Sequence, residues 1–546
     1  MSLPFARPGR LRPGWPDTMG ALIVGLCAFG YTFLSQGSLN NDHYMHLALA
    51  QQVLLGDVPG RDFVDPGMPL EYGLSAAVQH VWPGPFSEVL LTSALLSVAA
   101  ALTYSVVREL TGYRVAGVAA ATLQVVLDPR LYGYPKILVP AATLWAFGRF
   151  AAVPTRGRAI ALGLVTAMGM LLRHDLGLFA FAAVIVGFGV NFDDWRAAIR
   201  ESVRFTVVVL LGVSPYLIVV QVSEGLVENF RESLEFSRGE ANQLLIPWMR
   251  LPAADGASDP SVVLYYTAYL LIALGLVWVA RAPTRRTRAT AAAAVTLLTC
   301  FCLVVLRHPL PARVPDLGAV LAIVGVSVLV EAVHQVRTIR MAPVHASASA
   351  ALVLVTASPI GAIWQLGKPL EHVKETRIAD GWEKVAERVS ALASVGTEWP
   401  WRWYWPGGDM PDVVQYVSQC TAPDERILLT WFAPEYHFFS RRGFAAGHSF
   451  FSPGPAFATA SDTRKMVRRM RTEMVPLVLR SEGTREKFAE SYPELDAFID
   501  EHYDWFGEFA LRDGSVVRLG LRRDLRPTSR FGPQQWPCGF ANLPML

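Results

Sequence analysis

Apolar segments of membrane-spanning length recur along the chain, and they constrain the fold more than any other feature. An α-helix needs about 20 predominantly apolar residues to cross a bilayer, and eleven segments approach or reach that length, with 112–127 and 159–173 the least secure. The 546 residues are 52% hydrophobic and 17% charged, too apolar for an ordinary soluble enzyme. We therefore predict a mainly α-helical, polytopic membrane protein. The segments are 19–36, 88–107, 112–127, 137–153, 159–173, 176–191, 203–222, 261–280, 289–306, 317–335 and 347–366.

The distribution of Lys and Arg between alternate loops predicts the orientation. With residues 1–18 in the cytoplasm, the inside loops carry 17 Lys and Arg and the outside loops carry nine. Cytoplasmic loops are enriched in these residues, so the bias agrees with an odd number of spans. We expect the first outer loop, 37–87, and the C-terminus to lie outside the cytoplasmic membrane.

The first outer loop is polar and has the composition of a site. Asn40 and Asn41 offer an N-cap, and apolar residues at helical spacing predict a helix from Asp42 to Leu55. Asp42 falls in the first turn, where the helix dipole favours an ionised carboxylate. Two turns follow, and Pro69 opens a second predicted helix that runs to about Val81.

This loop resembles the first extracytoplasmic loop of the C-type (GT-C) glycosyltransferases. The shared pattern is an Asp just after the first span, a helix, and Gly-x-x-x-x-R-D-F-x-D-P-x-x-P-L before a second helix, about 45 residues in all. Span count and a terminal soluble domain extend the resemblance more weakly over the chain. Protein mannosyltransferases and lipid A aminoarabinose transferases belong to this superfamily. The resemblance implies transfer of a sugar from a polyprenyl phosphate with inversion at the sugar.

The loop offers one candidate base and several companions. Asp42 either takes a proton from an acceptor hydroxyl or only complements the helix dipole. Asp62 either contacts the sugar or stabilises the turn, while Asp65 is expected to be a turn residue whose side chain bonds to nearby backbone. His43 is a candidate substrate-binding residue, and the spacing of Asp42 and His46 is compatible with a metal ion. We favour no metal and no other cofactor, because protein cations suffice for a polyprenyl phosphate leaving group.

Cations at the outer ends of the spans are candidates to hold that phosphate. Lys136, Arg173 and Arg307 all lie there, where each either stabilises the departing phosphate or only extends to the membrane interface. The Arg173 motif, R-H-D-x-G, resembles the pattern of the same superfamily.

Residues 367–546 are expected to form a small extracytoplasmic α/β domain after the transmembrane domain 19–366. Charges become dense there, and predicted helices at 378–394, 410–420, 462–473 and 484–501 alternate with short strand-like runs. Residues 527–546 are rich in Pro and Gly and are predicted to be irregular. Cys420 and Cys538 both fall in this domain, where a disulfide can form, but the sequence does not decide whether they pair.

Two further stretches of this domain have alternative interpretations. Four Trp and one Tyr within 399–405 suit either a membrane interface or stacking on a sugar. One helical face carries five cations that either touch anionic lipid or are solvated. They are Arg464, Lys465, Arg468, Arg469 and Arg471.

These observations predict a multi-pass glycosyltransferase of the cell membrane. Its partners would be a polyprenyl-phosphate sugar donor, a glycan, lipid or protein acceptor, and membrane lipid. The scattered Arg residues form no nucleic-acid footprint. The alternatives are a polytopic transporter or flippase, for which mid-span charges and broken helices are typical, and a non-catalytic membrane scaffold. The sequence does not identify the sugar or the acceptor.

Overall fold

The computed structural model divides the chain into two compact units. The helical unit comprises residues 1–36, 89–215 and 246–392, and the loop-and-sheet unit comprises residues 37–88, 216–245 and 393–546. The residues that the structure describes are 15–36, 39–231, 234, 260–307, 311–338, 367–394, 410–451, 460–510 and 515–542.

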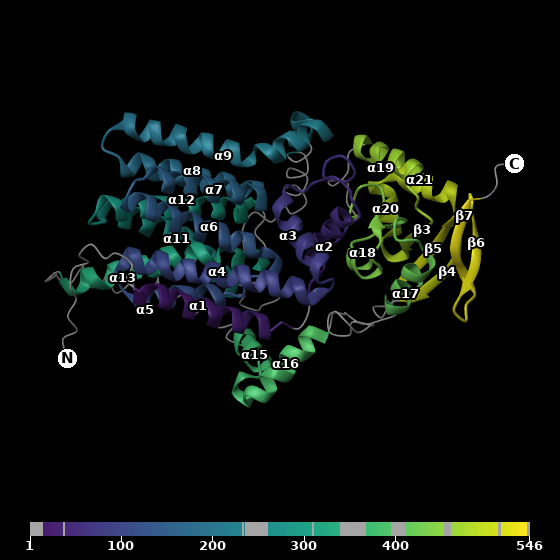
Figure 1. The fold of residues 1–546 in the computed structure, drawn as a ribbon, viewed down its shortest axis with the longest axis horizontal. Coiled ribbons are helices and arrows are strands. Elements are labelled where there is room, and N and C mark those ends of the chain that lie inside the picture. The colour runs from purple at the N-terminus through teal and green to yellow at the C-terminus, as the bar shows by residue number, and fades with distance from the viewer. Residues whose placement is uncertain are drawn as a thin grey trace. The chain divides into compact units, whose positions relative to one another are not determined.

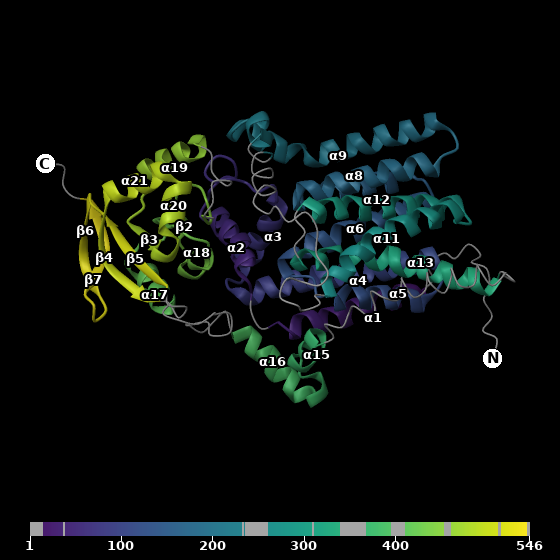
Figure 2. The ribbon, with the colours of Figure 1, turned by 180° about the vertical axis from the view of Figure 1, so that it is seen from behind.

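The helical unit consists largely of long helices, and many of these helices lie side by side in Figures 1 and 2. Helix α12 packs against α6, α8, α11 and α13, and α5 packs against α1 and α13. Boundaries with the other unit fall within α4, α9 and α16. The elements are α1 (Trp15–Leu34), α4 (Pro85–Thr111), α5 (Arg114–Val126), η1 (Leu131–Gly133), α6 (Tyr134–Ala152), α7 (Arg156–Leu172), α8 (His174–Asn191), α9 (Trp195–Ser223), α11 (Pro260–Arg281), α12 (Arg285–Arg307), η2 (Pro311–Leu317), α13 (Gly318–Thr338), α15 (Gly367–Glu375), η3 (Ile378–Asp380) and α16 (Trp382–Ser394).

Six of the described helices are long and apolar enough to cross a membrane, which is consistent with a membrane protein. They are α1, α4, α8, α9, α12 and α13. Helix α5 is a shorter apolar helix, and the predicted span 347–366 lies outside the described residues. The count of eleven spans and the orientation remain predictions.

Ion pairs join several of the long helices. Asp17 of α1 pairs with Arg108 of α4 and with Arg114 of α5, and the Arg114 Nε to Asp17 Oδ1 distance is 3.0 Å. Glu109 of α4 accepts a hydrogen bond from Arg286 of α12 at 2.6 Å. These three arginines, which the charge bias predicts to be on the cytoplasmic side, lie near helix ends and pair with carboxylates of neighbouring helices, so they also have a structural role.

The loop residues 39–88 fold as predicted into two helices around a double turn. Helix α2 (Asn41–Leu54) starts after Asn40, whose side chain accepts a hydrogen bond from the His43 N–H at 3.0 Å. Helix α3 (Pro69–Val81) has Pro69 at its first position, where a missing N–H is harmless. The two helices pack on each other, and Phe63 of the turn is fully buried beside α3.

The remainder of this unit contains a five-stranded sheet of order β2-β1-β3-β5-β4. Strand β1 runs parallel to β2 and β3, while β5 runs antiparallel to β3 and β4. Buried side chains of α19, α20 and α21 form one core with those of β1 and β3. The elements are α17 (Met410–Cys420), β1 (Arg426–Leu429), α18 (Glu435–Ser440), β2 (Gly443–Phe444), α19 (Ala460–Thr472), β3 (Leu477–Ser481), η5 (Glu482–Thr484), α20 (Arg485–Ser491), α21 (Pro493–His502), β4 (Tyr503–Ala510), β5 (Val516–Arg522), β6 (Leu525–Phe531) and β7 (Trp536–Asn542).

The C-terminal residues correct one prediction. The stretch expected to be irregular forms an antiparallel hairpin of β6 and β7, in which Pro527 lies opposite Phe540. Each strand of a two-stranded sheet is an edge, so a proline can be tolerated where its missing N–H faces outward. The turn between the strands contains Gly532 at φ +65°.

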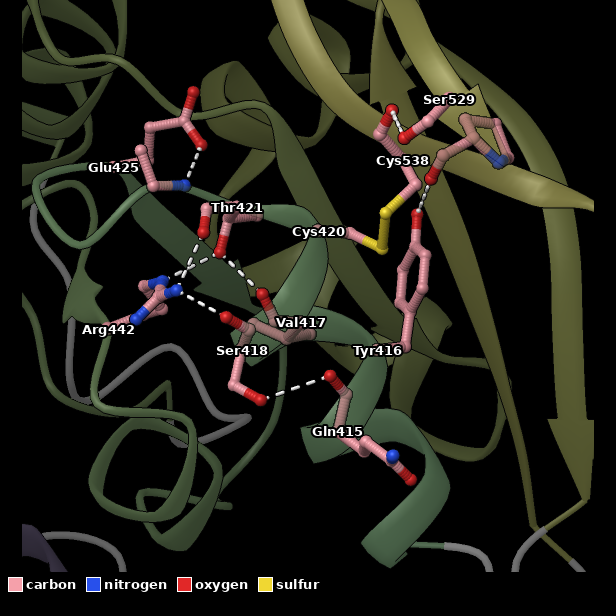
Figure 3. Close-up of a disulfide and its surroundings, with 12 residues drawn as sticks. Gln415, Tyr416, Val417, Ser418, Cys420, Thr421, Glu425, Arg442, Ser529 and Cys538 are labelled. Carbon is pink, nitrogen blue, oxygen red and sulfur yellow. Dashed lines mark hydrogen bonds between the residues drawn. A yellow bond between two sulfur atoms is a disulfide. The ribbon is translucent and has the colours of Figure 1, made fainter. Parts of the chain in front are cut away.

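A disulfide joins Cys420, the last residue of α17, to Cys538 of β7 (Figure 3). Next to it, the Tyr416 hydroxyl of α17 donates a hydrogen bond to the Pro537 carbonyl at 2.6 Å. The disulfide and this hydrogen bond therefore both hold the hairpin against α17. It closes a chain segment of 118 residues, and closing so long a loop constrains the unfolded chain strongly.

Candidate active site

Asp42 lies in the first turn of α2, with its side chain between buried and exposed. Helix N-termini carry a partial positive charge that stabilises a nearby carboxylate. The Asn40 cap fixes where the helix begins. The local sequence therefore holds an ionisable carboxylate at a defined place with some access to solvent.

The next residue, His43, is only 2% exposed and has a buried partner. Its Nε2 lies 3.0 Å from Glu88 Oε1, and the same oxygen accepts a hydrogen bond from the Ser75 hydroxyl at 3.1 Å. A second pair lies one turn along α2, where His46 Nδ1 is 3.5 Å from Glu71 Oε1. The structure thus places His43 in a buried polar cluster rather than beside open solvent.

Asp65 is a buried turn residue. One carboxylate oxygen accepts the N–H of Gly67 at 2.8 Å, and the other accepts the Tyr216 hydroxyl at 2.8 Å. Burial, with the Asp65 charge as the next cause, raises the pKa of Tyr72, so that phenol stays neutral. These hydrogen bonds agree with the turn chemistry expected for Asp65.

Asp62 is also engaged within the turn, but it is less buried. Its carboxylate accepts the Val58 N–H at 2.8 Å and pairs with the exposed Arg61 guanidinium at 2.6 Å. Burial alone would raise the pKa of Asp62, but the hydrogen bonds from Arg61 and Val58 outweigh it, and the pKa lies below its usual value. Asp62 is therefore ionised near neutral pH.

In the helical unit, Lys136 and Arg173 come together with partners that the sequence did not reveal. The Lys136 ammonium lies 2.5 Å from Asp316 Oδ2, and the charges of both Arg173 and Arg313 act on it. Arg173 makes a two-pronged pair with Asp175, at 2.8 and 2.9 Å. We call these five residues the cation cluster.

The cation cluster lies where three helices begin. Lys136 is in the first turn of α6, Arg173 is the N-cap of α8, and η2, which carries Arg313 and Asp316, leads directly into α13. Helix N-termini favour anions because their N–H groups and dipoles are directed toward them. Three such ends together with three cationic side chains make this place suited to a phosphate group.

Arg313 and Asp316 were missed because Asp316 lies 180 residues from its partner Lys136. The only available signal was an Arg and an Asp three residues apart in a short loop between two apolar segments. The predicted Arg307 is the last residue of α12, and its side chain lies outside the described part of the structure.

Candidate metal ligands do not cluster in the described part of the chain. Across the residues that the structure describes, no group of three or more His, Cys, Asp or Glu side chains is placed to hold a metal ion. The Trp-rich stretch 399–405 lies outside those residues.

Comparison with known proteins finds weak likeness among solved structures. No family model matches the chain, and no curated protein matches it. Among solved structures, the oligosaccharyltransferase of Archaeoglobus fulgidus, crystallised with zinc and sulfate, is similar with a TM-score of 0.44 and 9% identity, over 91% of this chain and 72% of that chain.

Proposed function

We propose that this protein is a membrane glycosyltransferase that moves a sugar from a polyprenyl-phosphate donor to an acceptor hydroxyl. The observation that carries the proposal is the cation cluster, in which Lys136, Arg173 and Arg313 meet at the N-terminal ends of apolar helices. Charged groups at membrane depth are costly and are kept there for a task. A lipid phosphate fits such a place, because its tail can lie against apolar helices while its phosphate contacts the cations at the helix ends.

In this mechanism the acceptor oxygen attacks the anomeric carbon of the donor sugar. As that bond forms, the bond from the anomeric carbon to the phosphate oxygen breaks, and polyprenyl phosphate leaves with the electron pair. Asp42 accepts the proton of the acceptor hydroxyl, a role that requires its ionised form. A single direct displacement inverts the configuration of the sugar.

The remaining predicted residues have supporting roles. Lys136, Arg173 and Arg307 stabilise the negative charge that grows on the departing phosphate. Asp62 contributes to substrate binding, while the buried His43 supports the start of α2 through Glu88 rather than by direct contact with substrate. The reaction takes place on the outer face of the cytoplasmic membrane and needs no metal. Glycans, lipids and proteins are all acceptable acceptor classes.

The test is to incubate the purified full-length protein with a panel of polyprenyl-phosphate sugars and candidate acceptors, and to measure released polyprenyl phosphate by mass spectrometry. We expect release with at least one donor, and we expect it to depend on Asp42. A protein that binds donors but releases no polyprenyl phosphate with any donor and acceptor would contradict the proposal and favour transport or a scaffold role.

A further inference from the structure

The loop-and-sheet unit contains a cavity of about 350 Å³ that the proposed function does not use. It lies between α19, the turn after Pro59, the segment after β2 and Glu224. Sites for small ligands start at about this volume. The lining residues are Gly60, Val64, Glu224, Ala446, His448, Asp462, Lys465, Met466, Arg468, Arg469 and Thr472.

One face of α19 supplies most of the cavity wall. The spacing of four lining residues places them on one side of this helix, because Arg468, Arg469 and Thr472 follow Lys465 by three, four and seven residues. Met470 is buried in the core that α19 shares with α20 and α21, which anchors the helix. The basic helical face seen in the sequence is thus divided, and three of its five cations line the cavity.

A backbone carbonyl helps to hold Arg469 in place. Its Nη2 donates a hydrogen bond to the Arg61 carbonyl at 2.9 Å. Gly447 has φ +75°, and a Cβ there would lie 1.5 Å from Arg469 Nη1. A side chain at position 447 would therefore displace the guanidinium, so the glycine leaves the space that Arg469 occupies.

The charges that face the cavity are three cations and two carboxylates. Burial, with the Arg469 charge as the next cause, lowers the pKa of His448 to about 4, so this imidazole is neutral near pH 7. Lys465 also lies 3.8 Å from Glu228. Like charges three or four residues apart on a helix destabilise it by a few tenths of a kcal/mol per pair, and a bound anion would remove that repulsion.

We propose that this cavity binds a phosphorylated sugar or a headgroup of the same chemistry. Lys465, Arg468 and Arg469 would contact the phosphate, because charge-assisted hydrogen bonds from Arg and Lys to phosphate are strong. Asp462 and Glu224 would accept hydrogen bonds from sugar hydroxyls, since ionised carboxylates act only as acceptors. The presence of both kinds of group favours a phosphorylated sugar over a bare phosphate. This inference does not depend on the proposed function, because it uses neither Asp42 nor the cation cluster.

The test is calorimetric titration of the full-length protein with glucose 1-phosphate, in a detergent that carries neither sugar nor phosphate. We expect saturable binding that glucose alone does not reproduce. The double variant Lys465→Gln with Arg468→Gln should weaken binding at least tenfold. Arg464→Gln is the matched control, because Arg464 is on the same helix but does not line the cavity, and within the described residues it pairs with Glu494, at 3.9 Å.

A second arm distinguishes the source of the ligand. Short-chain phosphatidylinositol that competes with glucose 1-phosphate identifies a lipid headgroup as an occupant, and lack of competition identifies a soluble phosphorylated sugar. The proposal is overturned if glucose 1-phosphate does not bind. It is also overturned if the double variant binds it like the parent, or if Arg464→Gln weakens binding equally.

Discussion

The start of α2 and the turn between Asp57 and Pro69 both carry carboxylates, but the two regions use them differently. In the turn, Asp65 is 5% exposed and each of its oxygens accepts a hydrogen bond from the protein. Asp42 is partly exposed in the first turn of its helix. Within one loop, therefore, hydrogen bonds hold the buried carboxylate in the turn, while the partly exposed carboxylate has the access to solvent that the proposed base requires.

The largest effect on stability is expected for Asp65→Ala. The change leaves the Tyr216 hydroxyl and the Gly67 N–H without their acceptor, and unsatisfied buried donors cost about 1–3 kcal/mol each. We expect a loss of about 4 kcal/mol, measured as a lower melting temperature in detergent. Asp65→Asn, which keeps an acceptor oxygen, should lose less. An Asp65→Ala protein as stable as the parent would show that the turn does not need this carboxylate.

Glu435 of α18 extends the comparison to a buried carboxyl whose Oε2 has no hydrogen-bond partner among the described residues. Burial raises its pKa from 4.5 to about 7, so the protonated form is favoured in the folded protein. The contribution of Glu435 to the free energy of unfolding is most favourable below pH 4.5. About 3 kcal/mol of this contribution is lost as the pH rises from 4.5 to 7. Glu435→Gln stays neutral and should therefore raise the melting temperature at pH 8 but hardly at pH 4.5.

The exposed Glu501 provides the control for that measurement. Its side chain is 78% exposed, so Glu501→Gln should leave the melting temperature within a degree or so of the parent at both pH values, as surface changes usually do. Equal melting temperatures of Glu435→Gln and the parent at pH 8 would mean that the Glu435 carboxyl is not held neutral by burial.

Arg173→Ala is expected to have a smaller effect, and on transfer rather than on folding. Removing a charge-assisted hydrogen bond to phosphate should reduce sugar transfer at least tenfold, about 1.4 kcal/mol, and should weaken donor binding. Arg204→Ala is the matched control, because Arg204 is exposed and pairs with Glu201 on its own helix. If the two variants transfer sugar equally well, Arg173 does not contact the donor.

The smallest effect is expected for Asp62→Asn. Asn keeps one oxygen that can accept the Val58 N–H and loses only a surface ion pair with Arg61. Exposed pairs contribute about 0–1 kcal/mol, so the melting temperature should change little at neutral pH. A loss as large as that of Asp65→Ala would erase the distinction between the two turn carboxylates.

Helix starts marked by caps were predictable from the sequence, but a local hairpin, a helix break and the long-range contacts were not. The Asn40 cap and Pro69 predicted where α2 and α3 begin, because capping acts within a few residues. The β6–β7 hairpin was missed because prolines and glycines are typical of loops, although an edge strand tolerates them. The predicted helix 484–501 is divided into α20 and α21 at Pro493.

The site was predictable only in part for the same reason. Lys136 and Arg173 stood out as cations at the ends of apolar segments, but the pairing of Lys136 with Asp316 depends on how distant helices pack. The cavity beside α19 likewise requires Gly447 and Glu224, which no spacing rule connects with the basic helical face.

The central claim is tested most directly by the sugar-transfer rate of Asp42→Asn, measured beside donor binding and melting temperature. Asn fits the same position in the helix but cannot take a proton, and a general base contributes about 10²- to 10⁴-fold in rate. We predict a folded protein that binds donor like the parent and transfers sugar at most about one-hundredth as fast. A variant that folds, binds donor and transfers sugar at more than about a tenth of the parental rate would contradict the assignment of Asp42 as the base.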